Sequence, residues 1–126
     1  MANLNKRLLL CFISMVSLLF FSSCFEKNNY HYPEYVYFPK EGGKMRVHGD
    51  KCFYGLSIED GCESVAYMRE DSTVMSYKWL TVIAEPQKEN IKIIVAPSDL
   101  KKKRKLRILG YYGREYAEIN VIQEGN

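Results

Sequence analysis

Short apolar runs separated by turn residues dominate the chain from Glu34 onward. A spacing of about eight to twelve residues between such turns is typical of an all-β sandwich or barrel. Within residues 44–48, Met45 and Val47 alternate with charged or polar side chains, which is the two-residue period of a half-buried strand. Apolar side chains seldom keep helical spacing for three turns. The sequence therefore predicts an all-β fold with almost no helix.

Seven to eight strands are expected, at residues 35–38, 44–48, 53–58, 64–69, 77–83, 91–96, 104–110 and 116–122. β-Branched and aromatic residues fill these runs and favour the pleated state. Gly42 and Gly43 permit positive φ at a tight turn after the first strand. Residues 59–61 are expected to close one hairpin, and Tyr112-Gly113 the last one.

The first 23 residues resemble an export signal. Lys6 and Arg7 precede an uncharged run from Leu8 to Phe21, and small residues follow it. This is the pattern of a secretory signal peptide, and the run is shorter than the roughly 20 apolar residues of a spanning helix. Removal of Lys6 and Arg7 would take the net charge from +3 to +1. Charge therefore gives no argument for a nucleic-acid partner.

Ser22-Ser23-Cys24 resembles the lipobox of bacterial lipoproteins, although Phe21 stands where Leu is usual. The resemblance implies that Cys24 receives a diacylglyceryl group and becomes the new amino terminus. The alternative is an ordinary signal peptide with an unmodified Cys24. We expect a signal peptide at 1–23, a lipidated tether at 24–33 and one domain at 34–126. The expected location is the outer membrane, on either face, with the membrane as partner through the N-terminal lipid.

Two further cysteines remain in the exported chain, Cys52 and Cys62. An even pair in an oxidising compartment makes them a disulfide candidate, and two separate free thiols are the alternative. A metal site on this pair lacks partners, because neither His31 nor His48 stands at ligand spacing. No metal and no cofactor is predicted.

Five segments in order resemble landmarks of the BACON domain (Bacteroidetes-associated carbohydrate-binding, often N-terminal): residues 38–43, 79–82, 91–96, 104–108 and 119–125. The resemblance covers about residues 34–125. It implies an immunoglobulin-like β-sandwich with a weak glycan-, mucin- or glycoprotein-binding role. It equally allows a structural spacer or an assembly subunit of an envelope complex.

Sugar binding requires exposed aromatic faces beside a few polar groups. Tyr111, Tyr112 and Arg114 lie at an expected hairpin tip, and Tyr54 lies near another turn. These four are the glycan-stacking candidates. The alternative is that the tyrosines simply cover sheet faces with their hydroxyls in water. We expect Trp79, the only tryptophan, to pack in the core.

The run Lys101, Lys102, Lys103, Arg104 and Lys105 is the strongest electrostatic feature. It predicts either attraction to anionic headgroups or acidic glycans, or a solvated loop that protects an edge strand. His31 and His48 have no nucleophile and orienting carboxylate near them in the sequence. The sequence therefore predicts a non-catalytic module and not an enzyme.

Overall fold

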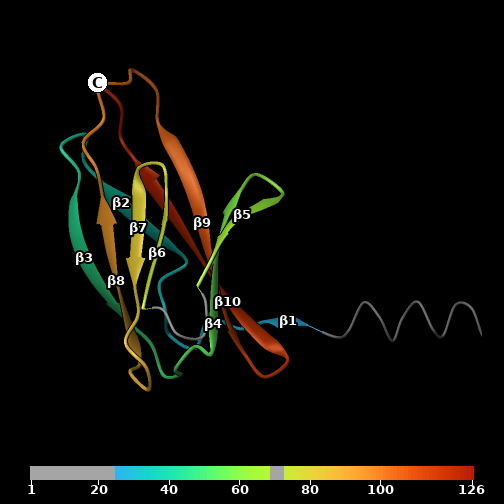
Figure 1. Cartoon of the computed structure of the whole chain (residues 1–126). Coiled ribbons are helices and arrows are strands. Elements are labelled where there is room, and N and C mark those ends of the chain that lie inside the picture. The colour runs from blue at the N-terminus through green and yellow to red at the C-terminus, as the bar shows by residue number, and fades with distance from the viewer. Residues whose placement is uncertain (1–24, 69–72) are drawn as a thin grey trace, which may run out of the picture.

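The computed structural model describes residues 25–68 and 73–126. Within these residues the chain forms ten strands and no helix (Figure 1). The predicted all-β class is confirmed. The strands are β1 (Glu26–Lys27), β2 (Tyr35–Phe38), β3 (Gly43–His48), β4 (Gly55–Asp60), β5 (Glu63–Tyr67), β6 (Val74–Tyr77), β7 (Leu80–Ile83), β8 (Asn90–Val95), β9 (Arg104–Tyr112) and β10 (Glu115–Gln123). The expected signal peptide and the expected lipidation site Cys24 lie outside the described residues.

The strands build two sheets. The six-stranded sheet has the order β1-β10-β9-β4-β5, and β2 also pairs with β10. The four-stranded sheet has the order β3-β8-β7-β6. Most pairs are antiparallel, but β1 and β2 both run parallel to β10. In Figure 1 the two sheets face each other as layers, which makes the fold a β-sandwich.

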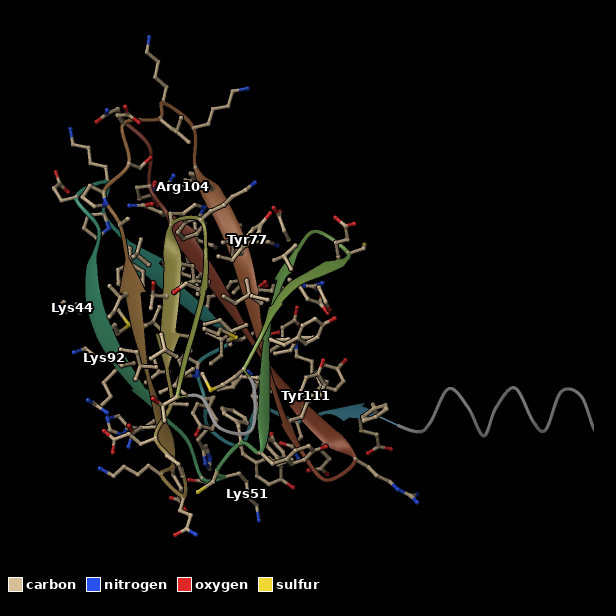
Figure 2. The ribbon with its side chains drawn as sticks, viewed as in Figure 1. Lys44, Lys51, Tyr77, Lys92, Arg104 and Tyr111 are labelled. Atoms are coloured by element: carbon tan, nitrogen blue, oxygen red, sulfur yellow. The ribbon has the colours of Figure 1, made fainter. Side chains whose placement is uncertain are left out.

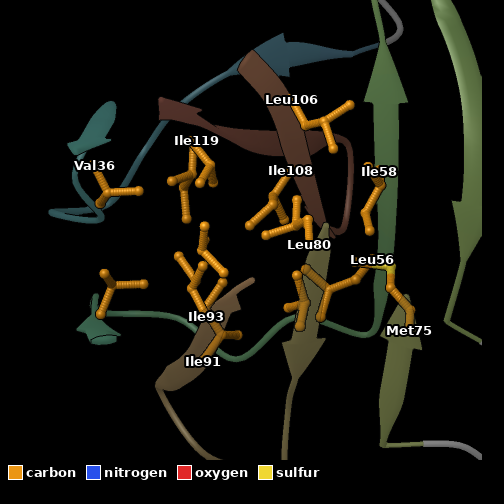
Figure 3. Packing of buried hydrophobic residues seen from close by; sticks show 14 of the residues in the cluster. Val36, Leu56, Ile58, Met75, Leu80, Ile91, Ile93, Leu106, Ile108 and Ile119 are labelled. Carbon is orange, nitrogen blue, oxygen red and sulfur yellow. The ribbon is translucent and has the colours of Figure 1, made fainter. Parts of the chain in front are cut away.

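The core lies between the two layers and is built by alternation along the strands. In β8, Ile91, Ile93 and Val95 point inward, and in β9, Leu106 and Ile108 do so. Figure 3 shows Ile91 and Ile93 of the four-stranded sheet meeting Leu106 and Ile108 of the six-stranded sheet in one cluster. Because successive side chains of a strand point to opposite faces, the same alternation leaves the polar residues outside.

The segment expected to be a tether belongs to the sandwich instead. β1 pairs with β10, and the backbone N–H of Asn28 donates to the carbonyl of Tyr116 at 2.8 Å. Tyr32 is buried, and its hydroxyl donates to the carbonyl of Lys51 at 2.7 Å. The expected boundary at residue 34 is therefore corrected: the described chain joins the sheet from Glu26 onward. The hydrogen bonds to β10 and the buried ring both favour this docked state.

The expected strand 77–83 is also corrected, because it is interrupted by a turn. β6 ends at Tyr77, and β7 begins at Leu80 and pairs back against it. Lys78 between them has φ of 52°. The turns at Gly42 and Gly113 have the positive φ that glycine allows (74° and 61°).

Within the described part of the chain, no helix is long and apolar enough to span a bilayer.

Candidate ligand-binding surface at the hairpin end

The turn between β9 and β10 brings Tyr54, Tyr111 and Arg114 to one end of the six-stranded sheet, which we call the hairpin end. The backbone N–H of Tyr54 donates to the carbonyl of Tyr111 at 2.9 Å, and its hydroxyl donates to the carbonyl of Gly113 at 3.0 Å. These two bonds fix the Tyr54 ring while 69% of the residue stays exposed. Tyr111 is half-buried and Arg114 is exposed. Figure 2 labels Tyr111 in this region.

A hollow of about 410 Å³ opens beside Tyr54. Its aromatic wall comes from Phe53 and Tyr54, and its polar groups come from Glu85 and Gln87 in the loop between β7 and β8. Small-ligand sites have volumes of about 300–1,000 Å³ and mix apolar walls with a few polar groups. The hollow is therefore large enough for a small saccharide.

Tyr112, by contrast, lies inside an aromatic stack that closes this end of the sandwich. Its ring stacks on Phe53 with centroids 5.4 Å apart and meets Tyr30 edge to face at 5.0 Å. Phe53 in turn contacts the buried ring of Tyr32 at 4.6 Å. The Tyr112 hydroxyl donates to the carbonyl of Asn28. These neighbours cover the ring faces on which a sugar would have to stack. Tyr112 is therefore not available as a stacking residue, unlike the other three candidates.

The surroundings of Tyr112 also perturb its ionisation. Burial raises the pKa of Tyr112 to about 12, with smaller contributions from Glu115 and Tyr30. Burial likewise raises the pKa of Tyr32. Both phenols therefore remain neutral hydrogen-bond donors in the stack at neutral pH.

Phe25 was not among the candidates, yet it lies at the hairpin end. Its ring meets that of Tyr111 edge to face, with centroids 6.5 Å apart, and 57% of the residue is exposed. The sequence carries one signal for it: Phe25 directly follows Cys24, the expected site of lipidation, and aromatic residues are common at membrane interfaces.

Tyr35 and Tyr37 form a second exposed aromatic pair, on the outer face of β2. Their rings are stacked with centroids 6.5 Å apart. Tyr37 is 58% exposed and lies beside Ile122, near the end of β10 that is remote from the hairpin. This pair is separate from the Tyr54 hollow and serves below as a comparison site.

The basic run lies at the opposite end of the sandwich, which we call the far end. Lys101, Lys102 and Lys103 are exposed in the loop before β9, and Lys103 pairs with Glu124 at 3.5 Å. Lys105 is exposed on β9. Arg104 differs from the lysines, because its Nε donates to Gln123 Oε1 at 2.7 Å. Arg104 therefore stabilises the fold through this hydrogen bond, whereas the lysines form the exposed charged surface.

The predicted disulfide between Cys52 and Cys62 is absent, and both residues are free thiols. Cys52 precedes β4 and Cys62 follows it in the turn to β5. The six residues of β4 span about 20 Å at ~3.3 Å per residue, whereas a disulfide needs Cα atoms within about 7 Å. The strand between the two cysteines thus keeps them at its opposite ends.

Charged side chains of the hairpin half form ion pairs with one another. Arg107 contacts Glu118 at 2.9 Å and Glu59 at 2.6 Å, and Lys27 contacts Glu118 at 3.3 Å. His31 pairs with Asp50 on the surface. Among residues 25–68 and 73–126, no three His, Cys, Asp or Glu side chains gather as metal ligands would. The pairs of Arg107 and Lys27 cross-link neighbouring strands, and the His31–Asp50 pair joins two loops.

No family model and no curated protein matches the sequence. Among solved structures, the chain is similar to a protein from Bacteroides thetaiotaomicron whose structure was determined by NMR. The TM-score is 0.58 at 15% sequence identity, over 74% of this chain and 81% of that one. At this identity the likeness concerns the fold alone.

Proposed function

We propose that the protein is an envelope-anchored lipoprotein whose single immunoglobulin-like, BACON-like module binds glycans weakly and without catalysis. Cys24 carries the lipid, and the outer membrane is the anchoring surface. The ligand is a saccharide or the glycan of a glycoprotein, held at Tyr54 with Tyr111 and Arg114 beside it.

One observation carries the proposal: Tyr54 is exposed yet held by two hydrogen bonds beside a mainly apolar hollow that also presents a few polar groups. A fixed aromatic ring loses little conformational entropy when a ligand covers it. A pyranose ring presents C–H groups to an aromatic face and hydroxyls to its surroundings. Glu85 and Gln87 in the hollow, and Arg114 on the hairpin, supply hydrogen-bond partners for those hydroxyls.

The weak affinity follows from the shape of the site. Tyr54 stays 69% exposed beside the hollow, so a ligand stacked on its ring keeps much of its own surface in water. Small-ligand affinity grows with the number of buried ligand atoms, and one or two sugar rings offer few. Avidity from several copies on one membrane then strengthens attachment to a polymeric glycan.

A glycan-array screen of the chain from Phe25 to Asn126 tests the binding. We expect Tyr54→Ala to lose the bound glycans and Tyr37→Ala to retain them, because both tyrosines are similarly exposed and only Tyr54 borders the hollow. Loss with Tyr37→Ala alone would place the glycan on β2 and overturn the site. Binding of no glycan by the parent chain would reject the function and leave a spacer or assembly subunit.

Metabolic labelling with a fatty-acid probe tests the anchor separately. The full chain should incorporate the label, and Cys24→Ala should not. Equal labelling of the two chains would reject lipidation at Cys24, whatever the glycan array reports.

A further inference from the structure

Almost no linker separates Cys24 from the first strand of the sandwich, which begins at Glu26. The backbone N–H of Glu26 donates to the carbonyl of Arg114 at 3.0 Å, and β1 then continues along β10. Only Phe25 separates Glu26 from Cys24. Two residues reach at most about 7 Å, so a lipid on Cys24 enters its membrane beside the β9–β10 hairpin.

The side chains around this point suit a bilayer surface. Phe25 and Tyr54 are exposed, Tyr111 contacts Phe25, and Arg114 extends from the hairpin tip. Aromatic residues with a polar tip and arginine both favour the headgroup region, where an apolar body and a polar end are accommodated together.

Charge neither drives nor prevents this contact. Glu26 and Glu115 lie on the paired strands beside Arg114, and Lys51 lies over the Tyr30 ring at 5.4 Å. The hairpin end is thus nearly balanced in charge, whereas the lysines gather at the far end. Nine residues of β9 separate the two ends, which is roughly 30 Å at ~3.3 Å per residue.

We propose that the hairpin end rests on the lipid bilayer, with Phe25, Tyr111 and Arg114 at headgroup level and the Lys101–Lys105 run pointing away from it. The inference rests on the lipidated Cys24 of the proposed function. It deepens that function, because Tyr54 in this orientation reaches saccharides carried at the bilayer surface. The basic run then faces the solvent and not the anionic headgroups.

Tryptophan quenching by brominated lipids tests the orientation. The full chain is expressed, processed and reconstituted in phosphatidylethanolamine–phosphatidylglycerol vesicles with brominated acyl chains. Trp79 is the only native tryptophan, and it lies beside Arg104 near the far end. Phe25→Trp should lose most of its added emission in these vesicles. Leu100→Trp, also exposed and in the lysine-bearing loop, should keep its emission, as Trp79 should.

A spacer variant provides the matched control. A flexible Gly/Ser insert of about ten residues between Cys24 and Phe25 lets the domain move some 15–20 Å from its lipid. If the lipid alone imposed the contact, this insert would abolish the quenching of Phe25→Trp; partial retention would show that the aromatic residues add to it. Either result supports the orientation in the native chain.

Mass spectrometry of the same samples keeps the two proposals apart. Equal quenching at positions 25 and 100, or none at either, in protein that carries the lipid would overturn the orientation and leave the anchor in place. Protein without the lipid mass would overturn both.

Discussion

The guanidinium group of Arg104 lies over the indole ring of Trp79, with its central carbon 4.7 Å from the ring centroid. Its Nε donates to Gln123, and one terminal nitrogen donates to the carbonyl of Pro97 at 3.3 Å. Gln123 is fully buried and donates to the carbonyl of Ala96 at 2.8 Å. Arg104 and Gln123 belong to the six-stranded sheet, and Trp79 belongs to the turn before β7. This group therefore ties the two sheets together at the far end.

Replacing Arg104 with lysine keeps the charge but removes the planar fork that stacks on Trp79 and reaches Gln123. We expect a loss of about 1–2 kcal/mol in the free energy of unfolding, as for a charge-assisted hydrogen bond. Urea denaturation of the chain from Phe25 measures it. Lys102→Ala, in the loop just before β9, should change stability by less than about 0.5 kcal/mol. Equal effects of the two variants would show that Arg104 does not join the sheets.

Gly110 leaves the space that the Phe53 ring fills. A Cβ at Gly110 would overlap that ring, whereas a Cβ at Gly55 would lie at an ordinary 3.9 Å from Tyr111. Gly110→Ala should therefore cost about 1–3 kcal/mol through overpacking, and Gly55→Ala should be close to neutral. Thermal unfolding of both variants measures the difference. An unchanged Gly110→Ala protein would mean that Phe53 is not held against β9.

Ser57 is buried on β4, and its hydroxyl has no hydrogen-bond partner in the described structure. An unpaired buried hydroxyl costs free energy, so Ser57→Ala should raise the free energy of unfolding by about 1 kcal/mol. Ser76→Ala is the control, because the Ser76 hydroxyl shares a hydrogen bond with Thr81 at 3.1 Å. Ser76→Ala should be neutral or slightly destabilising. A clear loss with Ser57→Ala would contradict the prediction.

Acid should weaken the sandwich through Glu118. Burial raises the pKa of this carboxyl, but hydrogen bonds from Arg107 and Lys27 outweigh it and leave the pKa below its usual value. Because the unfolded carboxyl titrates near pH ~4.3, the stabilisation is complete above that pH. It is lost as the pH falls through the lower folded value.

The free energy of unfolding, measured by denaturation between about pH 2 and 6, should fall with decreasing pH in the parent chain. The slope of this pH dependence should be smaller in Glu118→Gln. Glu41→Gln, at an exposed turn, should leave the slope unchanged. A Glu118→Gln protein with the parental pH dependence would contradict the role of the ion pairs.

The strands are largely predictable from the sequence because the alternation that forms them is local. Ile91, Ile93 and Val95 turn inward as the period of two requires. The break between β6 and β7 is not predictable in this way, because residues 77–83 are rich in aromatic and β-branched residues on both sides of it. Lys78 also adopts a positive φ that usually calls for glycine.

The candidate site is predictable in part. Tyr54 and Tyr111 each stand next to a turn, and the pairing of β4 with β9 brings them together. Tyr112 stands two residues after the buried Gly110 on β9. Because alternate residues of a strand share a face, Tyr112 lies on the inner face as well. The docking of β1 and β2 on β10 depends on parallel pairing between distant segments, which no local pattern encodes. The separation of Cys52 from Cys62 likewise depends on where β4 begins and ends.

The parallel pairing of β2 with β10 has a mechanical consequence. The chain enters at the hairpin end and leaves β10 at the other end, so tension between the two termini pulls these neighbouring strands past each other lengthwise. Their ladder, from Tyr35 beside Asn120 to Phe38 beside Gln123, is loaded in shear, and its bonds must give way together instead of unzipping singly. Resistance of the sandwich to a pull on its two termini therefore depends on this ladder between β2 and β10.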